Sequence, residues 1–458
     1  MKVIVCGAGQ VGYSIARYLA GEQNDVTVID RKPELVQRIN DTLDVQGMLG
    51  FASHPDVLDR AGASDADMII AVTFADEVNM VACQIAHSIF NVPMKIARVR
   101  HQSYLQPMWR NLFSRDNMPI DVIISPELEV ARAVKRRLEV PGAFDMIPFA
   151  EDKVRLLGVR CDDDCPVIDT PLQQLTELFP DLNIVVVGID RGGRLIVPTG
   201  DDQMLAGDEV FFIADTSHVP RALSAFGHEE EEARRVIIVG GGNIGLSLAQ
   251  ELENGADDVR AKIIELNRDR AEFTAEQLSR TVVLNGDALD SEILREANVQ
   301  NTETLVAVAD DDEVNILASL LAKREGCKRT ITLINNASYG PLLSSLGIDA
   351  AVNPRATTVS TILQHVRRGR IRGVHSLRDG AAEVLEAEAL ETSSLVGKPL
   401  RDVRLPDGII VGAVVRGERV IIPRGNTVIE VNDRVVMFAL ADMVRRVEKM
   451  FSVRLDFF

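Results

Sequence analysis

The chain opens on a glycine-rich turn that returns, little changed, halfway along the sequence. "VIVCGAGQVG" occupies residues 3–12 and "VIIVGGGNIG" occupies residues 236–245, so the spaced glycines recur at a constant offset (240 − 7 = 233). Each turn follows an apolar, β-branched run and opens a helical pattern, which is the local arrangement of a Rossmann-type βαβ unit. A duplicated signature of this kind restricts the chain to a tandem α/β architecture.

The repeat extends beyond the glycines. "AVTFADEVNMVACQIA" at 71–86 matches "AVADDDEVNILASLLA" at 307–322, and "RLIVPTGDDQMLAGDEVFFIA" at 194–214 matches "RVIIPRGNTVIEVNDRVVMFA" at 419–439. The 458 residues are therefore interpreted as two copies of a two-part unit. In each copy, alternating strand-like and helical runs predict a Rossmann-like, doubly wound parallel sheet, and the short strands that follow predict a small α+β domain. The predicted domains span 1–140, 141–226, 234–364 and 372–458.

Composition narrows the function. The net charge is −18 (50 − 68), so the chain on average repels phosphate polymers, and any anionic ligand needs a local site. Aromatic residues make up only 4%, which argues against base-stacking modules and against nucleic acid as a partner. The sparse, odd set of five cysteines is typical of a reducing compartment. With neither a signal-peptide pattern nor an apolar run of about 18–20 residues, the expectation is a cytoplasmic protein.

The glycine motifs carry the most specific chemistry. Gly7 permits a tight turn, Gly9 lets the backbone approach a pyrophosphate, and Gly12 lets helix and strand pack closely. The helix start offers free N–H groups and the positive end of a dipole. Asp30, and Glu265 in the second copy, end the following strand and are placed to accept hydrogen bonds from ribose hydroxyls. A carboxylate there repels a 2′-phosphate, which favours NAD(H) or an adenine nucleotide over NADP(H); the alternative is that the glycines only make a turn.

The two copies differ in charge at one strand end. "KIARVRH" at 95–101 carries Arg98 and Arg100 at alternate positions, whereas "TITLINN" at 330–336 carries no arginine. Ligands of such sheets bind at the carboxyl ends of the strands, where two arginines can clamp phosphates. The other interpretation is a strand of surface ion pairs. We therefore expect the first site to take the more highly charged ligand, and the second to hold NAD(H) or ADP or to bind more weakly.

Catalytic and metal-binding patterns are weak. None of the seven histidines recurs between the copies or has a carboxylate at catalytic spacing, no Tyr-x-x-x-Lys pair occurs, and no segment is left over as a substrate lobe. We expect no enzyme, with an NAD-dependent oxidoreductase as the alternative. "CDDDC" at 161–165 fits no zinc spacing and is interpreted as a solvated turn. "ADDDE" at 309–313 is interpreted as the acidic cap of the next helix, so no metal site is expected.

A family resemblance rests on five segments. "VIVCGAGQVG", "TVID", "ASHPDVLDRAG", "ADMIIAVTFADEVNMVACQIA" and "ARVR" resemble the regulator-of-potassium-conductance (RCK), or KTN, nucleotide-binding domain, and the small domains resemble its companion C-terminal domain. The tandem order is similar to that of the peripheral regulatory subunits of bacterial Trk potassium uptake systems. The resemblance implies a homo-oligomer, dimer or tetramer, that binds NAD(H) and ATP/ADP on the inner face of the cell membrane and gates a potassium-translocating membrane subunit of the TrkH/TrkG type. A potassium-sensing scaffold that binds nucleotide only structurally is a further alternative.

Carried over residue by residue, the resemblance implies two nucleotide sites and an internal pseudo-dimer. The first site comprises Gly7, Ala8, Gly9, Gln10, Val11, Gly12, Asp30, Phe51, Thr73, Phe74, Arg98 and Arg100. The second comprises Gly240, Gly241, Gly242, Asn243, Ile244, Gly245, Glu265, Asp287 and Ala309. The first copy departs from the family's usual Gly-Asp-Ala by having Phe51 in the middle position, so an adenine contact there has to use the Phe51 backbone.

Overall fold

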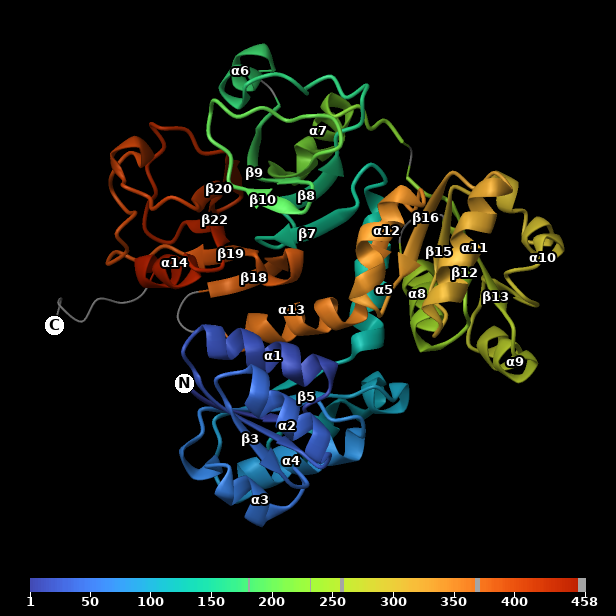
Figure 1. Cartoon of the computed structure of the whole chain (residues 1–458), viewed down its shortest axis with the longest axis vertical. Coiled ribbons are helices and arrows are strands. Elements are labelled where there is room, and N and C mark those ends of the chain that lie inside the picture. The colour runs from blue at the N-terminus through green and yellow to red at the C-terminus, as the bar shows by residue number, and fades with distance from the viewer. Residues whose placement is uncertain (180–181, 231, 256–258, 367–370, 452–458) are drawn as a thin grey trace. The chain divides into compact units, whose positions relative to one another are not determined.

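The computed structural model describes residues 1–179, 182–230, 232–255, 259–366 and 371–451. Within this part of the chain, a six-stranded parallel sheet is followed by a five-stranded antiparallel sheet, and the same pair then recurs (Figure 1). This confirms the predicted fold class of two Rossmann-like domains that are each followed by a small α+β domain. Among the described residues, none of the helices has the length and apolar character needed to cross a membrane. Two compact units are present, residues 1–130 with 353–366 and residues 131–352 with 367–458.

The first parallel sheet carries the first glycine loop. Its strand order is β3-β2-β1-β4-β5-β6, so the chain order reverses between β1 and β4. Ligands bind outside the carboxyl ends of the strands at such a reversal. β1 pairs in parallel with both β2 and β4, and all of it except its first residue is buried. The strands are β1 (Lys2–Cys6), β2 (Asp25–Asp30), β3 (Gln46–Leu49), β4 (Met68–Ala71), β5 (Met94–Arg98) and β6 (Val122–Ile124).

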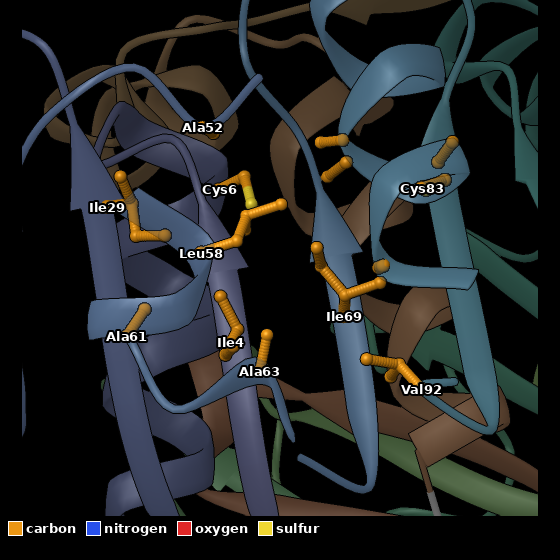
Figure 2. Packing of buried hydrophobic residues seen from close by; sticks show 14 of the residues in the cluster. Ile4, Cys6, Ile29, Ala52, Leu58, Ala61, Ala63, Ile69, Cys83 and Val92 are labelled. Carbon is orange, nitrogen blue, oxygen red and sulfur yellow. The ribbon is translucent and has the colours of Figure 1, made fainter. Parts of the chain in front are cut away.

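Helices cover both faces of this sheet. On one face, Ile4 and Cys6 of β1 and Ile69 of β4 pack against Leu58 and Cys83 from the covering helices (Figure 2). Full burial of an aliphatic side chain contributes about 1.5–3 kcal/mol, so this face anchors the sheet beneath the loop. The helical segments are α1 (Gln10–Gly21), α2 (Pro33–Thr42), α3 (Pro55–Arg60), η1 (Ala63–Asp65), α4 (Asp76–Ser88), η2 (Gln102–Leu105), η3 (Pro107–Phe113) and α5 (Pro126–Glu139).

A helix from far along the chain completes the other face. In α13 (Pro354–Val366), Ile362 and Leu363 join the core that contains Ile15 and Leu19 of α1, and α1 and α13 lie side by side (Figure 1). The helix that follows the second parallel sheet in sequence is thus part of the first compact unit. The predicted four-domain boundaries stay a prediction.

The second parallel sheet repeats the first. Its order, β14-β13-β12-β15-β16-β17, is the same topology with the same reversal beside the central strand. The strands are β12 (Arg235–Val239), β13 (Arg260–Glu265), β14 (Val282–Asn285), β15 (Thr304–Ala307), β16 (Arg329–Leu333) and β17 (Ala350–Val352). The helical segments are α8 (Asn243–Asn254), α9 (Arg268–Glu276), α10 (Ser291–Glu296), η5 (Val299–Asn301), α11 (Asp312–Arg324), η6 (Ala337–Tyr339) and α12 (Gly340–Ser345).

The two antiparallel sheets share a core within the second compact unit. Phe211 and Ile213 of the first sheet and Phe438 and Val436 of the second belong to one buried cluster. The first has the order β10-β9-β11-β8-β7 and the second β18-β19-β22-β20-β21. Their elements are β7 (Asp145–Phe149), β8 (Val154–Arg160), α6 (Leu172–Leu178), β9 (Ile184–Arg191), β10 (Arg194–Ile196), β11 (Glu209–Asp215), η4 (Thr216–His218), α7 (Val219–Ala225), β18 (Ile371–Leu377), η7 (Arg378–Gly380), β19 (Ala382–Glu388), η8 (Leu400–Asp402), β20 (Ile409–Arg416), β21 (Arg419–Ile421), β22 (Arg434–Leu440) and α14 (Val444–Phe451).

Strands β7 and β18 were not evident as strands in the sequence. Each is an edge strand that pairs with only one neighbour in its sheet. β7 contains Pro148, and β18 contains Gly373 at a register shift in its pairing with β19. Proline and glycine are tolerated at sheet edges and bulges but weaken the alternating pattern by which a strand is recognised.

Candidate nucleotide-binding sites

The first glycine loop is shaped by close backbone approach. Gly7 has a φ of +110°, and a side chain on it would meet the backbone of Val72 and Thr73 at 3.1 Å. The packing around Gly12 is closer still, because a Cβ there would lie 1.8 Å from the Gly7 carbonyl oxygen. Gly9 has open space around its missing side chain and precedes α1 without a side-chain cap. The first N–H groups of α1 are therefore free of a capping side chain, as an anion site requires.

Asp30 supports the loop as well as facing the site. One carboxylate oxygen accepts a hydrogen bond from the Ala8 backbone N–H (2.7 Å) and the other accepts one from the Lys32 N–H (2.9 Å). A carboxylate oxygen has two lone-pair directions, so each of these oxygens can still accept a ribose hydroxyl. The side chain thus connects the end of β2 to the glycine loop, a role that the sequence did not reveal.

A buried asparagine holds the next strand end in place. Asn79 of α4 is fully buried, and its carbonyl oxygen accepts hydrogen bonds from the Thr73 N–H (2.8 Å) and hydroxyl (2.7 Å). Its amide nitrogen donates to the Thr73 and Arg98 carbonyl oxygens at 3.1 and 2.9 Å. Asn79 therefore sets the positions of two predicted site residues on neighbouring strands. Asn79 was not predicted as a site residue, although the recurrence of "DEVN" at 76–79 and 312–315 is a signal that points to it.

Arg98 and Arg100 have different surroundings. Arg98 ends β5 and donates from Nη2 to the Thr73 carbonyl oxygen (2.7 Å), while its buried Nε has no hydrogen-bond partner. Burial lowers the pKa of the Arg98 guanidinium, and the charge of Arg100 acts in the same direction. Arg100 lies beyond the strand and is paired through Nε with Glu127 at 2.7 Å. Arg98 thus keeps a buried donor, its Nε, that has no hydrogen-bond partner among the described residues.

These elements surround a pocket of about 650 Å³. Of the predicted first-site residues, the pocket is lined by Gly7, Gly9, Gln10, Val11, Asp30, Phe51, Thr73, Phe74 and Arg98, whereas Ala8, Gly12 and Arg100 lie outside its lining. Two exposed basic residues that the sequence did not single out, Arg31 and Lys32, also line it. The pocket therefore combines three cationic side chains with one carboxylate, which favours an anionic ligand.

The aromatic residues of this pocket are exposed. Phe51 is 50% exposed and stacks on His54 with ring centroids 5.2 Å apart. Phe74 is 84% exposed, and the Arg100 guanidinium lies 5.7 Å from its ring centroid. Exposed rings at a pocket mouth offer flat surfaces on which a base can stack.

The second glycine loop repeats the backbone geometry. Gly240 has a φ of +100° beside Ala309, and a Cβ on Gly245 would lie 2.0 Å from the Gly240 carbonyl oxygen. Gly242 precedes α8, which begins with Asn243 and Ile244, without a side-chain cap. The Glu265 carboxylate accepts hydrogen bonds from the N–H groups of Gly241 (2.6 Å) and Asn267 (2.8 Å), as Asp30 does in the first copy.

The charge around the second loop is arranged differently. Arg270 donates from Nε to the Gly241 carbonyl oxygen (2.7 Å) and from Nη2 to the Asn243 side-chain oxygen (3.1 Å). The equivalent residue of the first copy is Leu35, which lines the first pocket. The second loop thus has its cation on α9 rather than at the end of β16. Arg270 was not predicted as a site residue from the sequence, because it lies on α9 and not at a strand end.

The other predicted second-site residues lie near this loop or on its supports. Ala309 exchanges hydrogen bonds of 2.8 Å with the side chain of the fully buried Asn315, the counterpart of Asn79. Asp287 is exposed, and its carboxylate accepts the Leu289 N–H at 2.9 Å. The same support by a buried asparagine therefore occurs in both copies.

Two acidic segments have the structures expected of them. The three aspartates of the 161–165 segment are exposed, while Cys161 and Cys165 at its ends are buried. In the other segment, the Asp311 carboxylate caps α11 by accepting the Val314 N–H at 2.9 Å. The solvated turn and the acidic helix cap predicted from the sequence are both confirmed.

Comparison with known proteins matches every part of this architecture. Residues 3–126 and 236–354 match the TrkA-N domain family, and residues 156–227 and 384–452 match the TrkA-C domain family. The Trk system potassium uptake protein TrkA of Azorhizobium caulinodans is 57% identical over 458 residues, 100% of both chains. That of Halomonas elongata is 44% identical over 462 residues, again 100% of both chains.

A solved structure shares the fold at low sequence identity. The GsuK channel bound to NAD is 16% identical, with a TM-score of 0.57 over 99% of this chain and 79% of the channel chain. The fold and the paired glycine loops define a protein of two tandem modules, each a Rossmann-like sheet followed by a small antiparallel domain. The full-length identities are more specific: the chain belongs to the TrkA family of Trk system potassium uptake proteins. The resemblance seen in the sequence is thereby confirmed.

Proposed function

We propose that this chain is the nucleotide-responsive regulatory subunit of a Trk potassium uptake system. It acts as a homo-oligomer, dimer or tetramer, at the inner face of the cell membrane, on a separate potassium-translocating subunit of the TrkH/TrkG type. The proposal is supported by full-length identity to proteins named for Trk potassium uptake and by two glycine loops with the geometry of nucleotide sites. The division into domains at 1–140, 141–226, 234–364 and 372–458 is part of the proposal.

The first site is proposed to bind ATP or ADP. The observation that carries this assignment is Arg98, whose buried Nε has no partner at the edge of a pocket that also contains Arg31 and Lys32. A guanidinium with free N–H groups gains charge-assisted hydrogen bonds from a phosphate, and the uncapped start of α1 favours the same anion. Asp30 is proposed to accept the ribose hydroxyls. The full first set of predicted residues is retained as the proposed site.

The second site is proposed to bind NAD(H), with ADP as the other candidate. Glu265 is the proposed ribose acceptor, and Arg270, which lies near the loop, already donates to Gly241 and Asn243. A site with fewer free cations suits a ligand with fewer phosphate charges. The GsuK channel, which shares the fold, has been solved bound to NAD, and this agrees with the assignment. The full second set of predicted residues is retained as the proposed site.

Regulation then follows from differential binding. A ligand shifts a conformational equilibrium only by its difference in affinity for the two states, typically by about 1–3 kcal/mol of coupling free energy. We infer that ATP and ADP, which differ in charge, favour different arrangements of the two halves of the chain. Such a change transmitted to the membrane subunit alters potassium flux.

An NAD-dependent oxidoreductase remains the alternative. Hydride transfer needs an acid–base group beside the nicotinamide. The absence of enzymatic activity stays a prediction, which a panel of alcohols and hydroxy acids tests by NADH absorbance. Turnover that is lost in a Gly9→Ala variant would favour the oxidoreductase.

The binding experiment is calorimetric titration of NADH, ATP and ADP into the purified full-length chain. Arg98→Ala is expected to weaken ATP binding about 10- to 100-fold, because charge-assisted hydrogen bonds contribute about 1.5–3 kcal/mol. Arg100→Ala is expected to have a smaller effect, because Arg100 is already paired with Glu127. Arg60→Ala, which changes an exposed arginine of α3 that is paired with Asp56, is the matched control.

A flux experiment connects binding to function. Vesicles containing the membrane subunit and this chain are expected to show different potassium flux with ATP and with ADP, and Arg98→Ala is expected to reduce the difference. Equal binding of ATP and ADP without a change of shape would remove the proposed mechanism. Flux that responds to potassium but not to nucleotide would favour the structural-scaffold alternative.

A further inference from the structure

Another cavity, of about 470 Å³, lies at the opposite edge of the second parallel sheet from the glycine loop. Its wall includes Thr304 and Arg329, at the amino ends of β15 and β16, together with residues 141–144 ahead of β7 and residues 228–230. All of these residues belong to the second compact unit. Because nucleotides bind these sheets at the carboxyl edge, the cavity is separate from both proposed nucleotide sites.

Two polar side chains of this cavity have unused hydrogen-bonding capacity. Thr304 is fully buried, and its hydroxyl oxygen has no partner. The Arg329 Nη1 is also buried without a partner, and the described part of the chain provides no ion pair for this guanidinium. Buried polar groups are almost always hydrogen-bonded in native proteins, so two unsatisfied groups in one cavity offer hydrogen-bonding capacity to a ligand.

The local charges show what kind of ligand fits. Burial lowers the pKa of the Arg329 guanidinium, although Asp349 and Glu230 act in the opposite direction. Asp349 is not a free counter-ion, because it is paired with Lys323 at 2.7 Å. The adjacent Lys328 is exposed at the cavity wall. Arg329 is therefore a guanidinium of the cavity wall that has no ion-pair partner among the described residues.

The other carboxylates of the wall limit the charge of the ligand. Glu303 is paired with Arg235, and Glu229 accepts the Ser224 hydroxyl at 3.0 Å. Glu230 faces His228 at 3.4 Å, and Asp162 is exposed. These groups repel a polyanion such as a nucleoside triphosphate but leave a single compact anionic group acceptable next to a guanidinium.

We propose that this cavity binds a small oxyanion, a phosphate or carboxylate group, held by the Arg329 guanidinium with the Thr304 hydroxyl as a second donor. The planar guanidinium matches such a group in a bidentate manner. A volume of about 470 Å³ leaves room for the organic part of a metabolite that carries the anion. Bound there, the ligand connects the second parallel sheet to the connection ahead of β7, which gives the chain an effector site apart from its nucleotides.

The test measures thermal unfolding of the full-length chain in sodium phosphate or sodium acetate, at ionic strength kept constant with sodium chloride. Either anion is expected to raise the unfolding temperature saturably, because a ligand stabilises the state that binds it. The two arms distinguish a phosphate ligand from a carboxylate ligand. Arg329→Met is expected to weaken the apparent affinity at least tenfold, and Thr304→Val to weaken it in the same direction.

The unliganded variants provide an independent readout. Because each substitution removes an unsatisfied buried polar group, both are expected to be at least as stable as the wild type in chloride alone. Arg324→Gln, an exposed arginine of α11 outside the cavity, is the matched control and is expected to retain the anion effect. Arg98→Ala reports anion binding at the first glycine loop instead.

Three results would overturn the proposal. The first is stabilisation by phosphate and acetate that is no greater than by chloride. The second is an anion effect that Arg98→Ala removes and Arg329→Met leaves intact. The third is a loss of stability in Arg329→Met and Thr304→Val without any anion, which would mean that these side chains already have structural partners.

Discussion

Replacing two glycines of the first loop by alanine, one at a time, separates packing from binding. In Gly12→Ala, the new Cβ would lie 1.8 Å from the Gly7 carbonyl oxygen, where ordinary contact begins at 3.4 Å, a deficit of 3.4 − 1.8 = 1.6 Å. The obstacle is backbone, so no change of rotamer relieves it, and α1 has to move away from β1. Overpacking of this kind costs about 1–3 kcal/mol. We expect the upper end, which lowers the unfolding temperature of a unit of this size by roughly 6–12 °C.

Gly9→Ala is expected to weaken nucleotide binding while leaving the stability of the fold nearly unchanged. Nothing lies within 4 Å of the position that its Cβ would take, and its φ of −64° with ψ of −175° is accessible to alanine. We expect its free energy of unfolding to stay within about 0.5 kcal/mol of the wild type. Because Gly9 lines the pocket, the methyl group occupies space that a phosphate needs to approach the backbone, and nucleotide affinity is expected to fall at least tenfold.

The assay pairs urea unfolding, followed by circular dichroism, with calorimetric titration of ATP and NADH. The second loop supplies a matched pair, because Gly242 is open around its Cβ position and Gly245 would be 2.0 Å from the Gly240 oxygen. A Gly12→Ala variant as stable as the wild type would contradict the predicted overpacking. A Gly9→Ala variant that binds nucleotide with unchanged affinity would contradict the predicted close approach of a phosphate.

Two further predictions concern the antiparallel domains. Burial raises the pKa of Glu383 to about 8, and Glu448 acts in the same direction. The folded carboxyl therefore stays protonated below that pH, whereas the unfolded carboxyl ionises above its pKa of about 4.3. The stabilising contribution to the free energy of unfolding is complete below the unfolded pKa and is lost at about 1.4 kcal/mol per pH unit as the pH rises towards 8. Glu383→Gln should flatten this slope in urea titrations at several pH values, and an unchanged slope would contradict the assignment. Arg378→Ala removes ion pairs to Asp190 (2.7 Å) and Glu209. It is expected to lower the free energy of unfolding by about 2 kcal/mol. A loss below about 0.5 kcal/mol would show that these ion pairs are unimportant for stability.

Local patterns were enough to predict the framework of each candidate site. The positions of Gly7, Gly12 and Asp30 depend on spacing within one βαβ unit. In such a unit, residues that are close in sequence determine the alternation of the strand, the turn that follows it and the start of the helix. The same is true of the Asp311 cap, whose partner lies three residues away. The duplication also predicted the tandem order of sheets, because each copy repeats the pattern of strands and helices.

The roles of several polar side chains depended on contacts between distant segments. Asn79 looks like an ordinary helix residue, yet it is buried and bonded to two strand ends. Arg98 and Arg100 are equivalent by spacing, but it is Arg100 that forms the ion pair with Glu127, at 2.7 Å. A sequence pattern reports which face of an element is apolar, but not which polar group another element brings to it. The sequence by itself therefore determined the two Rossmann-like frameworks, and the tertiary structure decided which cations stay free, because pairing between remote charges exists only after the chain has folded.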